Sequence, residues 1–340
     1  IFHNYLFPKY LALINKIYRL GFKTHNNIIH STALIKTGLG KELKLNKSYK
    51  NIDIINLHWL GDSTLSIEEI GLIKKPIVWT LHDQWPFCGA EHYTYQIPNK
   101  NSQFIDKRYF SNYDKESRLS FEKGKDINRM TWLRKKKAWR QKMHIVCPST
   151  WMKACAQRSS LFKDYPVYTV PNPIDTNFWL PIPKDEARNK LGLSVNKKLI
   201  LFGAINTEEE RKGIFFLIEA LKKLNLVLED KMIKKIELII FGEGKDNIIK
   251  SNFPIKFTGR INDDSKLNLI YSAADIFVNP SIQESFGQTA SEAHACGTPV
   301  VAFNVSGLKD IIEHLETGYL AKPYDTKSLA MGIKWTIENS

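Results

Sequence analysis

Short apolar runs alternate along the chain with segments of helical periodicity. The runs are rich in β-branched residues and almost continuously apolar, and they lie at 52–59, 76–83, 144–149, 167–172, 198–204, 236–242, 275–281 and 298–303. Such runs are typical of strands covered on both faces, as in parallel sheets. Helical periodicity separates the last four runs, at 213–230, 263–274 and 286–296. The pattern therefore predicts α/β layers built on parallel sheets.

A proline-containing segment interrupts this alternation. Residues 165–186 hold five prolines and show no helical period, which predicts a hinge. A chain of 340 residues is long enough for two domains of about 150 residues each. We expect an N-terminal domain over 1–170, a linker over 171–183 and a C-terminal domain over 184–340. Residues 1–50 predict one amphipathic helix and no opening strand, so the N-terminal sheet is expected to be incomplete.

Composition narrows the class of protein. The hydrophobic fraction of 43 % is enough for two cores, and no apolar run approaches the roughly 18 residues of a membrane span. No signal peptide is visible, and the four cysteines lie far apart without a C-x-x-C pair. We expect a cytoplasmic protein of a reducing compartment, without disulfides or a zinc site.

The formal charge of +14 predicts attraction to phosphate groups, and part of it is concentrated. Residues 123–142 hold nine lysines and arginines against one acid, Asp126, and Trp132, Trp139 and Met143 recur at helical spacing nearby. We interpret this segment as a surface helix whose aromatic stripe meets the core, with the basic residues opposite. Contact with an anionic membrane surface or an acidic acceptor is the alternative. Nucleic acid has no motif behind it, and we expect none as a partner.

Two glutamates eight positions apart stand near the C-terminal end. The spacing predicts that Glu284 lies in a loop before a helix beginning at about Phe286, and that Glu292 lies two turns into that helix. Eight helical residues span about 12 Å, roughly the reach of a nucleotide sugar from hexose to ribose. Glutamates on a helix are usually solvated, but the small residues around Glu292 and the buried strand that follows indicate a packed helix.

The first turn of this helix lies between the two carboxylates. Its free N–H groups, around Gly287 and Gln288, and the helix dipole would favour a pyrophosphate there. Carboxylates that accept hydrogen bonds from sugar hydroxyls would flank it. The sequence therefore predicts a site for a sugar diphosphate nucleotide.

The same stretch, PSIQESFGQTASEAHACGTPVVAF, resembles the E-x7-E signature of family 4 of the retaining glycosyltransferases, which have the two-domain GT-B fold. Other segments resemble the same family or its subgroup that builds bacterial capsules, O-antigens and exopolysaccharides, at 55–59, 76–87, 171–179 and 307–325. The resemblance covers most of residues 50–340. It implies two Rossmann-like domains that face a cleft.

The resemblance also implies roles for residues of the second domain. Glu284 would contact the hydroxyls of the donor sugar, and Glu292 would bind the ribose. Lys212 would neutralise the diphosphate together with Arg211, because Ala204 stands where many relatives have an arginine. Without the resemblance, the Arg211–Lys212 pair reads equally well as a solvated helix start.

Five further positions complete the expected donor site, three in the second domain and two in the first. Gly242 ends a strand in a G-x-G turn, which alone is a weak signal, and Arg260 falls where relatives hold the base. Phe286 stands at the expected start of the helix and is also expected to contact the donor. His82 and Asp83 end a strand of the first domain, where α/β sheets place ligands, and the resemblance brings the histidine near the reacting carbon. His58 is a weaker candidate for the acceptor side.

The expected reaction is transfer of a sugar from a UDP- or GDP-sugar to a hydroxyl of a glycan or lipid-linked oligosaccharide, with retention, in cell-surface polysaccharide biosynthesis at the inner face of the membrane. Neither a D-x-D motif nor a His/Cys cluster is present, so we expect no metal and no cofactor. Two alternatives remain open: a non-catalytic basic α/β protein that binds nucleic acid or anionic membrane, and a GT-B sugar-nucleotide epimerase. Relatives also carry elements at both ends that are not visible here, so we expect a fragment.

Overall fold

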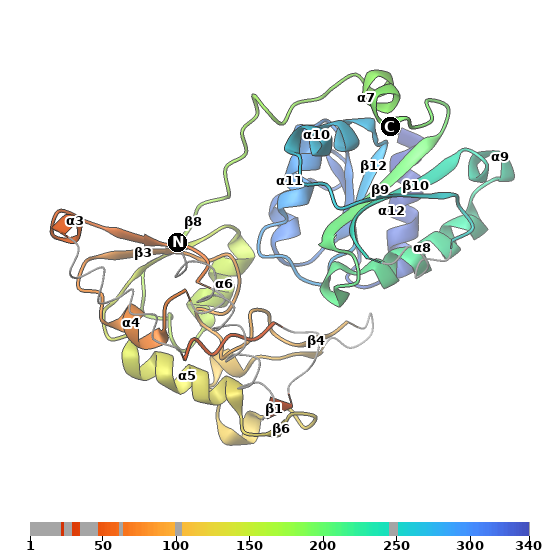
Figure 1. Cartoon of the computed structure of the whole chain (residues 1–340). Coiled ribbons are helices and arrows are strands. Elements are labelled where there is room, and N and C mark those ends of the chain that lie inside the picture. Colours follow the sequence, from red (N-terminus) through yellow and green to blue (C-terminus); the bar gives the residue numbers. More distant parts are fainter. Residues whose placement is uncertain are drawn as a thin grey trace, which may run out of the picture. The chain divides into compact units, whose positions relative to one another are not determined.

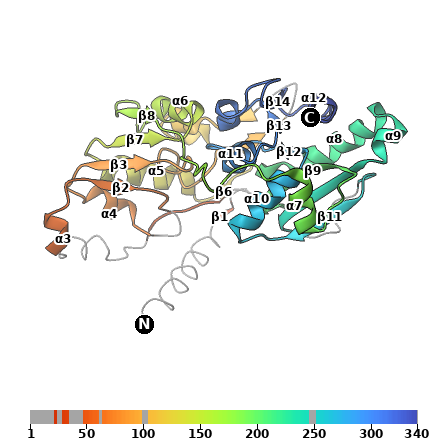
Figure 2. The ribbon, with the colours of Figure 1, turned by 90° about the horizontal axis from the view of Figure 1, so that it is seen from above.

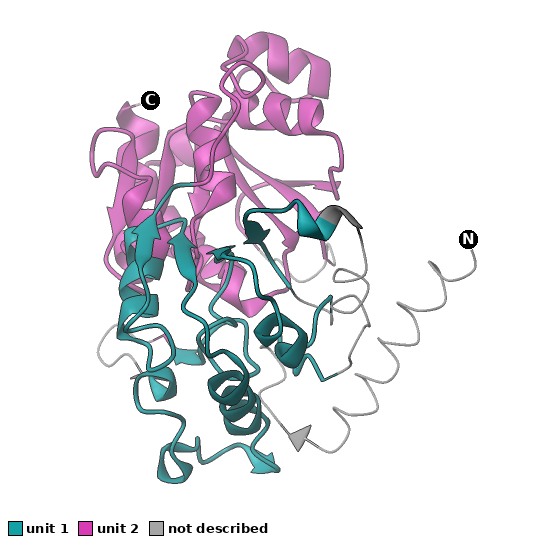
Figure 3. Cartoon of the chain, turned by 90° about the vertical axis from the view of Figure 1, so that its left-hand side faces the viewer, with its two compact units in different colours: residues 1–97, 105–171 teal, residues 98–104, 172–340 magenta. Residues whose placement is uncertain are grey.

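The computed structural model describes residues 22–23, 29–34, 47–60, 64–98, 104–244 and 251–339. It divides into two compact units, residues 1–97 with 105–171 and residues 98–104 with 172–340 (Figure 3). Most of the segment for which the sequence predicts an N-terminal amphipathic helix lies outside the described residues. Each unit is an α/β body with its own sheet and its own core.

The sheet of the second unit has six strands, and every pair within it is parallel. In spatial order the strands are β11 (Ile255–Gly259), β10 (Ile236–Glu243), β9 (Lys198–Asn206), β12 (Ile276–Asn279), β13 (Val300–Phe303) and β14 (Gly318–Ala321). The order reverses between β9 and β12. At such a reversal the loops after two neighbouring strands diverge, which is where open α/β sheets bind ligands.

Helices cover both faces of this sheet. The helix α12 (Thr326–Asn339) packs against α8 (Ile214–Val227) on one face, and α10 (Asp264–Ala273) packs against α7 (Lys184–Leu191) and α11 (Gln288–Ala295) on the other (Figure 1). A short helix, α9 (Asp230–Ile233), follows α8. Because neither face of the central strands meets water, every residue of β12 and β13 is buried.

The helix between the two signature glutamates begins later than expected. Its first residue is Gln288. Gly287 adopts a left-handed conformation with φ of 110°, so the chain turns there before the helix begins. A side chain at Gly287 would also meet Leu308 Cδ2 at 2.8 Å. Glu292 therefore lies one turn into α11 and not two, which corrects the expectation from spacing.

The first unit contains a four-stranded parallel sheet. Its strands in spatial order are β2 (Ile55–Leu57), β3 (Ile77–Thr80), β7 (His144–Cys147) and β8 (Val167–Thr169). Two smaller sheets join β1 (Phe22–Lys23) to β6 (Lys123–Gly124) and β4 (Gln96–Ile97) to β5 (Phe104–Ile105). The helices are α3 (Lys47–Lys50), α4 (Ile67–Gly71), α5 (Ile127–Ala138) and α6 (Thr150–Arg158), and α4 packs against α5 (Figures 1 and 2).

The basic segment forms α5 and the turn after it. Asp126 caps the helix by accepting a hydrogen bond from the Arg129 N–H. Trp132 and Trp139 are buried, so the aromatic stripe meets the core as expected. The helix ends at Ala138, however, so Met143 reaches the core from beyond it.

Lys135 departs from the expectation that the basic residues of this helix face solvent. It is wholly buried, and its ammonium group donates hydrogen bonds to the carbonyl groups of Trp85, Cys88 and Gly89. The same nitrogen lies 3.9 Å from the centre of the Trp85 ring. Burial lowers the pKa of Lys135 to about 7. Three backbone carbonyl groups of the turn 85–89 thus bind the Lys135 ammonium group, which the sequence pattern predicted to be solvated.

All four cysteines are free and buried, in agreement with the expected absence of disulfides. Within the described ranges, none of the helices has the length and apolarity needed to cross a membrane.

Candidate functional site

The loops that follow β9 and β12 are held together at the carboxyl edge of the second sheet. After β9, the chain makes a single 3-10 turn (Glu210–Lys212) and reaches Gly213, whose φ of 73° is left-handed. A Cβ at Gly213 would lie 2.0 Å from the Pro280 carbonyl oxygen, so only glycine allows this approach. The Ile282 N–H donates a hydrogen bond of 2.8 Å to the Arg211 carbonyl. The basic pair and the signature loop therefore occupy one place.

Glu284 lies between the two cations. Lys212 Nζ donates to its Oε1 at 2.6 Å, and an Arg211 guanidinium nitrogen donates to its Oε2 at 3.2 Å. The Ser281 hydroxyl donates to Oε1 at 2.9 Å. Burial by itself would raise the pKa of Glu284, but Lys212 and Arg211 outweigh it and lower the pKa to about 2. Glu284 is therefore an ionised, acceptor-only group at any physiological pH.

The backbone around Glu284 is anchored from both sides. Its N–H donates to the Ser306 hydroxyl at 2.9 Å, and its carbonyl accepts from the Gly307 N–H at 3.0 Å. Arg211 also donates to the Gln283 carbonyl at 2.9 Å. These bonds fix where the carboxylate points, because the side chain has little freedom left once its backbone and both oxygens are held.

The charges of this cluster balance. Arg211 forms a second ion pair with Glu209 at 2.8 Å, so two cations face two carboxylates. An ammonium group has three N–H donors, and Lys212 uses one of them on Glu284. No other partner of the Lys212 ammonium occurs in the described part of the chain, so two donors are left for an incoming anion.

Glu292 has a different environment from Glu284. The buried Tyr271 hydroxyl, on α10, donates to its carboxylate at 3.0 Å. Burial raises the pKa of Glu292, while the hydrogen bond from Tyr271 opposes the shift. The two signature glutamates are thus held by separate partners, and Glu292 offers its half-buried carboxylate one turn along α11.

The two predicted residues of the first unit are also held separately. His82, just after β3, forms a hydrogen bond of 2.9 Å with His58, just after β2. Asp83 is 5 % exposed and turns to His92, whose Nδ1 lies 2.6 Å from its Oδ2. The other nitrogen of His92 contacts the Ser31 hydroxyl at 2.7 Å. Asp83 therefore orders the turn after β3, while His82 remains half-buried.

Comparison with known proteins concerns mainly the second unit. Residues 183–340 match the family model described as glycosyl transferases group 1. This part of the chain is similar to a group 1 glycosyltransferase domain. An uncharacterized glycosyltransferase of Methanocaldococcus jannaschii is 36 % identical over 154 residues, which cover 43 % of this chain and 37 % of the relative. The match thus spans less than half of that protein.

Solved structures agree on the fold. Sucrose-phosphate synthase from Thermosynechococcus elongatus superposes with a TM-score of 0.62 at 20 % identity, over 88 % of this chain and 68 % of that one. Anabaena HepE, solved in complex with UDP-glucose, gives a TM-score of 0.59 at 19 % identity, over 88 % and 74 %. The likeness shows the GT-B glycosyltransferase fold, as the sequence predicts.

The remaining predicted residues of the second unit do not join the Glu284 cluster directly. Gly242, near the end of β10, has φ of 123°, and a Cβ there would lie 1.8 Å from the Ala204 carbonyl oxygen. Glycine is therefore required at position 242, because β9 and β10 pack too closely there for a side chain. Arg260, after β11, pairs with Glu243 at 2.6 Å, and both side chains are about half exposed. Phe286 is buried, whereas Gln288 at the start of α11 is exposed.

Several site residues escaped the sequence reasoning. Ser281 lies three positions before Glu284 in the quoted motif, so its place in the loop was a usable signal. Ser306 and Tyr271 come from distant segments, and Ser31 and His92 meet across 61 positions, so no local pattern could have paired them.

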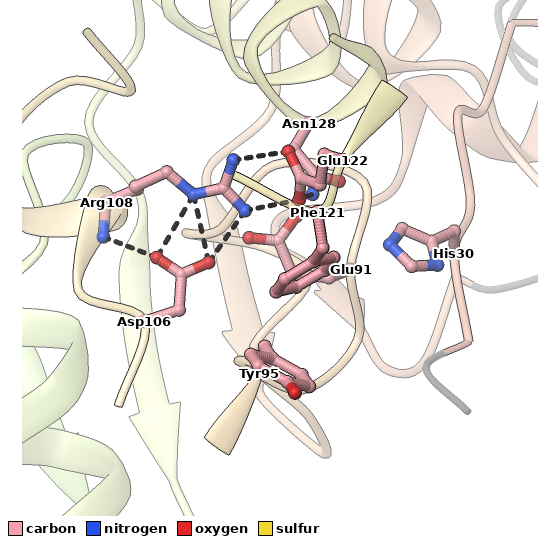
Figure 4. A pocket seen from close by; sticks show the side chains of 8 residues that line it. All are labelled: His30, Glu91, Tyr95, Asp106, Arg108, Phe121, Glu122 and Asn128. Atoms are coloured by element: carbon pink, nitrogen blue, oxygen red, sulfur yellow. Dashed lines mark hydrogen bonds and ion pairs between the residues drawn. The ribbon is translucent and has the colours of Figure 1, made fainter. Parts of the chain in front are cut away.

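The first unit also holds a small pocket (Figure 4). Its lining side chains are His30, Glu91, Tyr95, Asp106, Arg108, Phe121, Glu122 and Asn128. The Arg108 guanidinium is taken up by Asp106 at 2.7 Å and by Glu122 at 2.8 Å. Glu91 accepts a hydrogen bond from the Tyr113 hydroxyl through one oxygen, and the other oxygen is buried and has no hydrogen-bond partner among the described residues. Burial, reinforced by Asp106, raises the pKa of Glu91 to about 7.

Within the described residues, no three acidic, histidine or cysteine side chains are arranged to hold a metal ion.

Proposed function

We propose that the protein transfers a glycosyl group from a nucleotide diphosphate sugar to an acceptor hydroxyl, with retention of the anomeric configuration. The observation that carries the proposal is the Glu284 carboxylate, fixed and ionised between Lys212 and Arg211 at the carboxyl edge of a parallel sheet, in a unit that matches the group 1 glycosyltransferase model. The donor is a UDP- or GDP-sugar. HepE, a structural neighbour, is known in complex with UDP-glucose, which supports this donor class.

The two cations suit a leaving diphosphate. In glycosyl transfer the anomeric carbon becomes oxocarbenium-like while negative charge grows on the departing phosphate. Lys212 keeps two N–H donors beyond its bond to Glu284, and these would bind phosphate oxygens. Preorganised donors of this kind stabilise the charge that develops in the transition state. Arg211 adds a second positive charge next to Lys212 and supplies what a relative's arginine would provide at Ala204.

The two glutamates suit the two sugars of the donor. Glu284 is ionised and anchored, so it would accept hydrogen bonds from hydroxyls of the transferred sugar. Glu292 would accept from the ribose, and the first-turn N–H groups of α11 between them would face the diphosphate. This differs from the carboxylate pair of a glycoside hydrolase, which flanks the scissile bond at roughly 5–9.5 Å.

Retention follows, in this proposal, from attack on the same face that the diphosphate leaves, with a phosphate oxygen as the base for the acceptor hydroxyl. In this proposal the N–H donors of Lys212, with Arg211 beside it, stabilise the diphosphate in place of a metal ion, so the transfer needs no metal ion and no cofactor. The catalytic role of His82 in the first unit, which the family resemblance implies, stays a prediction. The acceptor is a glycan or a lipid-linked oligosaccharide from which a cell-surface polysaccharide is built. The basic helix α5 would contact the anionic membrane surface at which this acceptor lies.

The test is donor binding and UDP release. We expect Lys212→Ala and Glu284→Ala to lower kcat/KM by about 100-fold or more, the usual result of removing one electrostatic donor or its anchor. Lys222→Ala is the matched control, because Lys222 lies on α8 of the same unit, its side chain is 58 % exposed, and it pairs with the neighbouring Glu219 and not with Glu284. Its kcat/KM should stay unchanged. Equal losses in Lys222→Ala and Lys212→Ala would contradict the proposal.

The product and the salt dependence separate the remaining possibilities. Proton NMR of the product should show the donor's anomeric configuration, and chelator treatment should leave the rate unchanged. Release of UDP without any acceptor-dependent product, but with a changed donor sugar, would indicate an epimerase. Tight, salt-sensitive RNA binding with no binding of nucleotide sugars would indicate the basic binding protein instead.

A further inference from the structure

Ser306, in the loop after β13, has a backbone conformation that side chains rarely adopt. Its φ of 48° lies in the left-handed region. A residue with a Cβ is strained there, because the Cβ comes too close to the following carbonyl oxygen, whereas glycine takes the same conformation freely. Ser306 is also buried. A strained residue of this kind persists only where its surroundings and its side chain hold it in place.

The loop that contains Ser306 binds the main chain of Glu284. The Ser306 hydroxyl oxygen accepts a hydrogen bond of 2.9 Å from the Glu284 N–H. The next residue, Gly307, donates its N–H to the Glu284 carbonyl oxygen at 3.0 Å. Both main-chain polar groups of Glu284 are thus held by two consecutive residues. Because these residues are adjacent, the backbone turn at Ser306 decides whether both hydrogen bonds can form together.

The loop after β13 lies close against the signature loop. A Cβ at Gly307 would lie 2.6 Å from the Ser285 carbonyl oxygen and 2.8 Å from that of Phe286, so only glycine fits there. At position 306 a glycine would suit the left-handed backbone as well, yet the chain has serine. What serine adds to glycine is a hydroxyl group, and this hydroxyl binds the Glu284 N–H. The bond to Glu284 therefore explains why a side chain stands in a conformation that favours glycine.

We propose that Ser306 is a positioning residue of the donor site, which carries strain in its own backbone and holds the Glu284 main chain where the carboxylate meets its two cations. This rests on the proposed function, because it takes Glu284 as a donor-binding carboxylate. The cations hold the carboxylate oxygens, whereas Ser306 and Gly307 hold the main chain from which the side chain extends. Without the hydroxyl, the buried Glu284 N–H loses its acceptor, and the signature loop has to shift to find another.

Stability and donor binding should therefore respond differently to substitution of Ser306. Ser306→Gly removes the hydroxyl and also the strain, so its two effects on stability oppose each other and the unfolding equilibrium constant should change by less than about threefold. Ser306→Ala removes the hydroxyl and keeps the strain, and its unfolding constant should be about fivefold higher than that of Ser306→Gly. Both variants leave the Glu284 N–H without its acceptor, so both should bind the donor equally weakly.

The first experiment measures the binding of UDP-glucose to the full chain by calorimetry, with GDP-glucose as the second probe if the site prefers guanine. We expect Kd to rise about tenfold in both Ser306→Gly and Ser306→Ala, which corresponds to the loss of one hydrogen bond to a buried N–H group. Chemical denaturation of the same samples gives their stability. If Ser306 served folding alone, Ser306→Gly would keep the wild-type Kd, and this result would overturn the proposal.

Leu315 provides a matched control in the same unit. It is another non-glycine residue in the left-handed region, with φ of 68°, and it is 49 % exposed. Leu315→Gly removes a comparable strain and leaves the Ser306 hydroxyl in place, so its Kd for the sugar nucleotide should equal that of the wild type. A rise in Kd as large as that of Ser306→Gly would show that the relief of strain disturbs the site, and not the loss of the hydroxyl, which would also overturn the proposal.

The second experiment observes the Glu284 carboxylate without any ligand. Lys212 and Arg211 lower the pKa of Glu284 to about 2, which requires that the carboxylate stays between them. Carbon NMR of the side-chain carboxyl group, with its signal assigned by its loss in Glu284→Gln, should show a higher pKa in Ser306→Gly, closer to the ordinary value of 4.5. An unchanged pKa in this variant would mean that the two cations place the carboxylate by themselves, and the positioning role would be wrong.

The outcomes separate this inference from the function on which it rests. Binding of UDP-glucose that is lost in Lys212→Ala but unchanged in Ser306→Gly would uphold the transferase and overturn the positioning role. No binding of any nucleotide sugar would instead remove the proposed function, and the donor-site role of Ser306 with it. A raised pKa of Glu284 in Ser306→Gly would still show, in that case, that the hydroxyl places the carboxylate.

Discussion

Glu284 in the second unit and Glu91 in the first are both buried, at 8 % and 2 % exposed, yet their pKa values move in opposite directions. Burial raises both. Glu284 has Lys212 and Arg211 in direct contact, and its pKa falls to about 2. The nearest guanidinium to Glu91 is bound by Asp106 and Glu122, and the pKa of Glu91 rises to about 7.

The comparison shows that the allocation of cations, more than burial, decides what a buried carboxyl group can do. Glu284 is a permanent acceptor, as the recognition of sugar hydroxyls requires. Glu91 carries a proton through much of the acidic range and accepts from Tyr113 in a pocket with other acids. Two similarly buried carboxyl groups thus differ in charge: Glu284 stays ionised and can accept hydrogen bonds from a ligand, whereas Glu91 changes its protonation state near neutral pH.

The largest expected effect concerns Lys135, the buried cation of α5. Lys135→Ala leaves the carbonyl groups of Trp85, Cys88 and Gly89 without their donor and opens a cavity beside two tryptophans. We expect the free energy of unfolding to fall by about 4 kcal/mol in chemical denaturation. Lys135→Met, which keeps the stem, should lose less. Exposed Lys137→Ala is the control, expected to stay within about 0.5 kcal/mol. Equal effects of Lys135→Ala and Lys137→Ala would show that the buried ammonium does not stabilise the fold.

Glu284→Gln removes the charge between the two cations in the second unit. The cations are 16 % and 21 % exposed, so solvent screens part of the loss, and we expect about 2 kcal/mol at pH 7. Because the folded pKa is lowered, this stability is present above the ordinary value of 4.5 and is lost as the pH falls toward 2. Denaturation at pH 7 and pH 3 should show the difference between wild type and variant shrinking in acid. A constant difference would mean that the lowered pKa is not its cause.

Glu91→Gln should have the opposite sign. The folded pKa of Glu91 is raised, so wild-type stability from this group is present below about pH 4.5 and is lost as the pH rises through about 7. The amide keeps an acceptor for Tyr113 and carries no charge. We expect the variant to be more stable than wild type by about 1–2 kcal/mol at pH 8 and nearly equal at pH 5, measured by denaturation at both pH values. A variant that is less stable at pH 8 would indicate that an ionised Glu91 is tolerated.

The smallest expected effect is at Arg260. Its pair with Glu243 is about half exposed, and exposed ion pairs contribute little, so Arg260→Ala should change the free energy of unfolding by less than about 0.5 kcal/mol. If Arg260 holds the base, binding of UDP measured by calorimetry should still weaken. Unchanged binding would limit the donor site to the Glu284 side of the sheet.

The amino-acid sequence by itself determined eight of the ten strands of the two parallel sheets, the helices α8, α10 and α11, and the place of the Glu284 signature. Continuous β-branched runs and helical periodicity are local properties, and all eight predicted runs contain a strand. β11 and β14 were not predicted: β11 contains polar residues and is nowhere fully buried, and β14 has four residues of which only the first and last are buried, so neither shows a long continuous apolar run. The start of α11 was misplaced because Gly287 takes a left-handed turn that spacing does not reveal.

Only the tertiary structure decided which charges are buried and with which partners. Lys135 meets carbonyl groups about 50 positions away, and Glu284 meets cations more than 70 positions away. The Asp83 carboxylate is turned to His92 and not to the adjacent His82. Local patterning reports whether a residue type prefers water, but the free energy of a buried charge depends on the dipoles and countercharges that the fold brings to it.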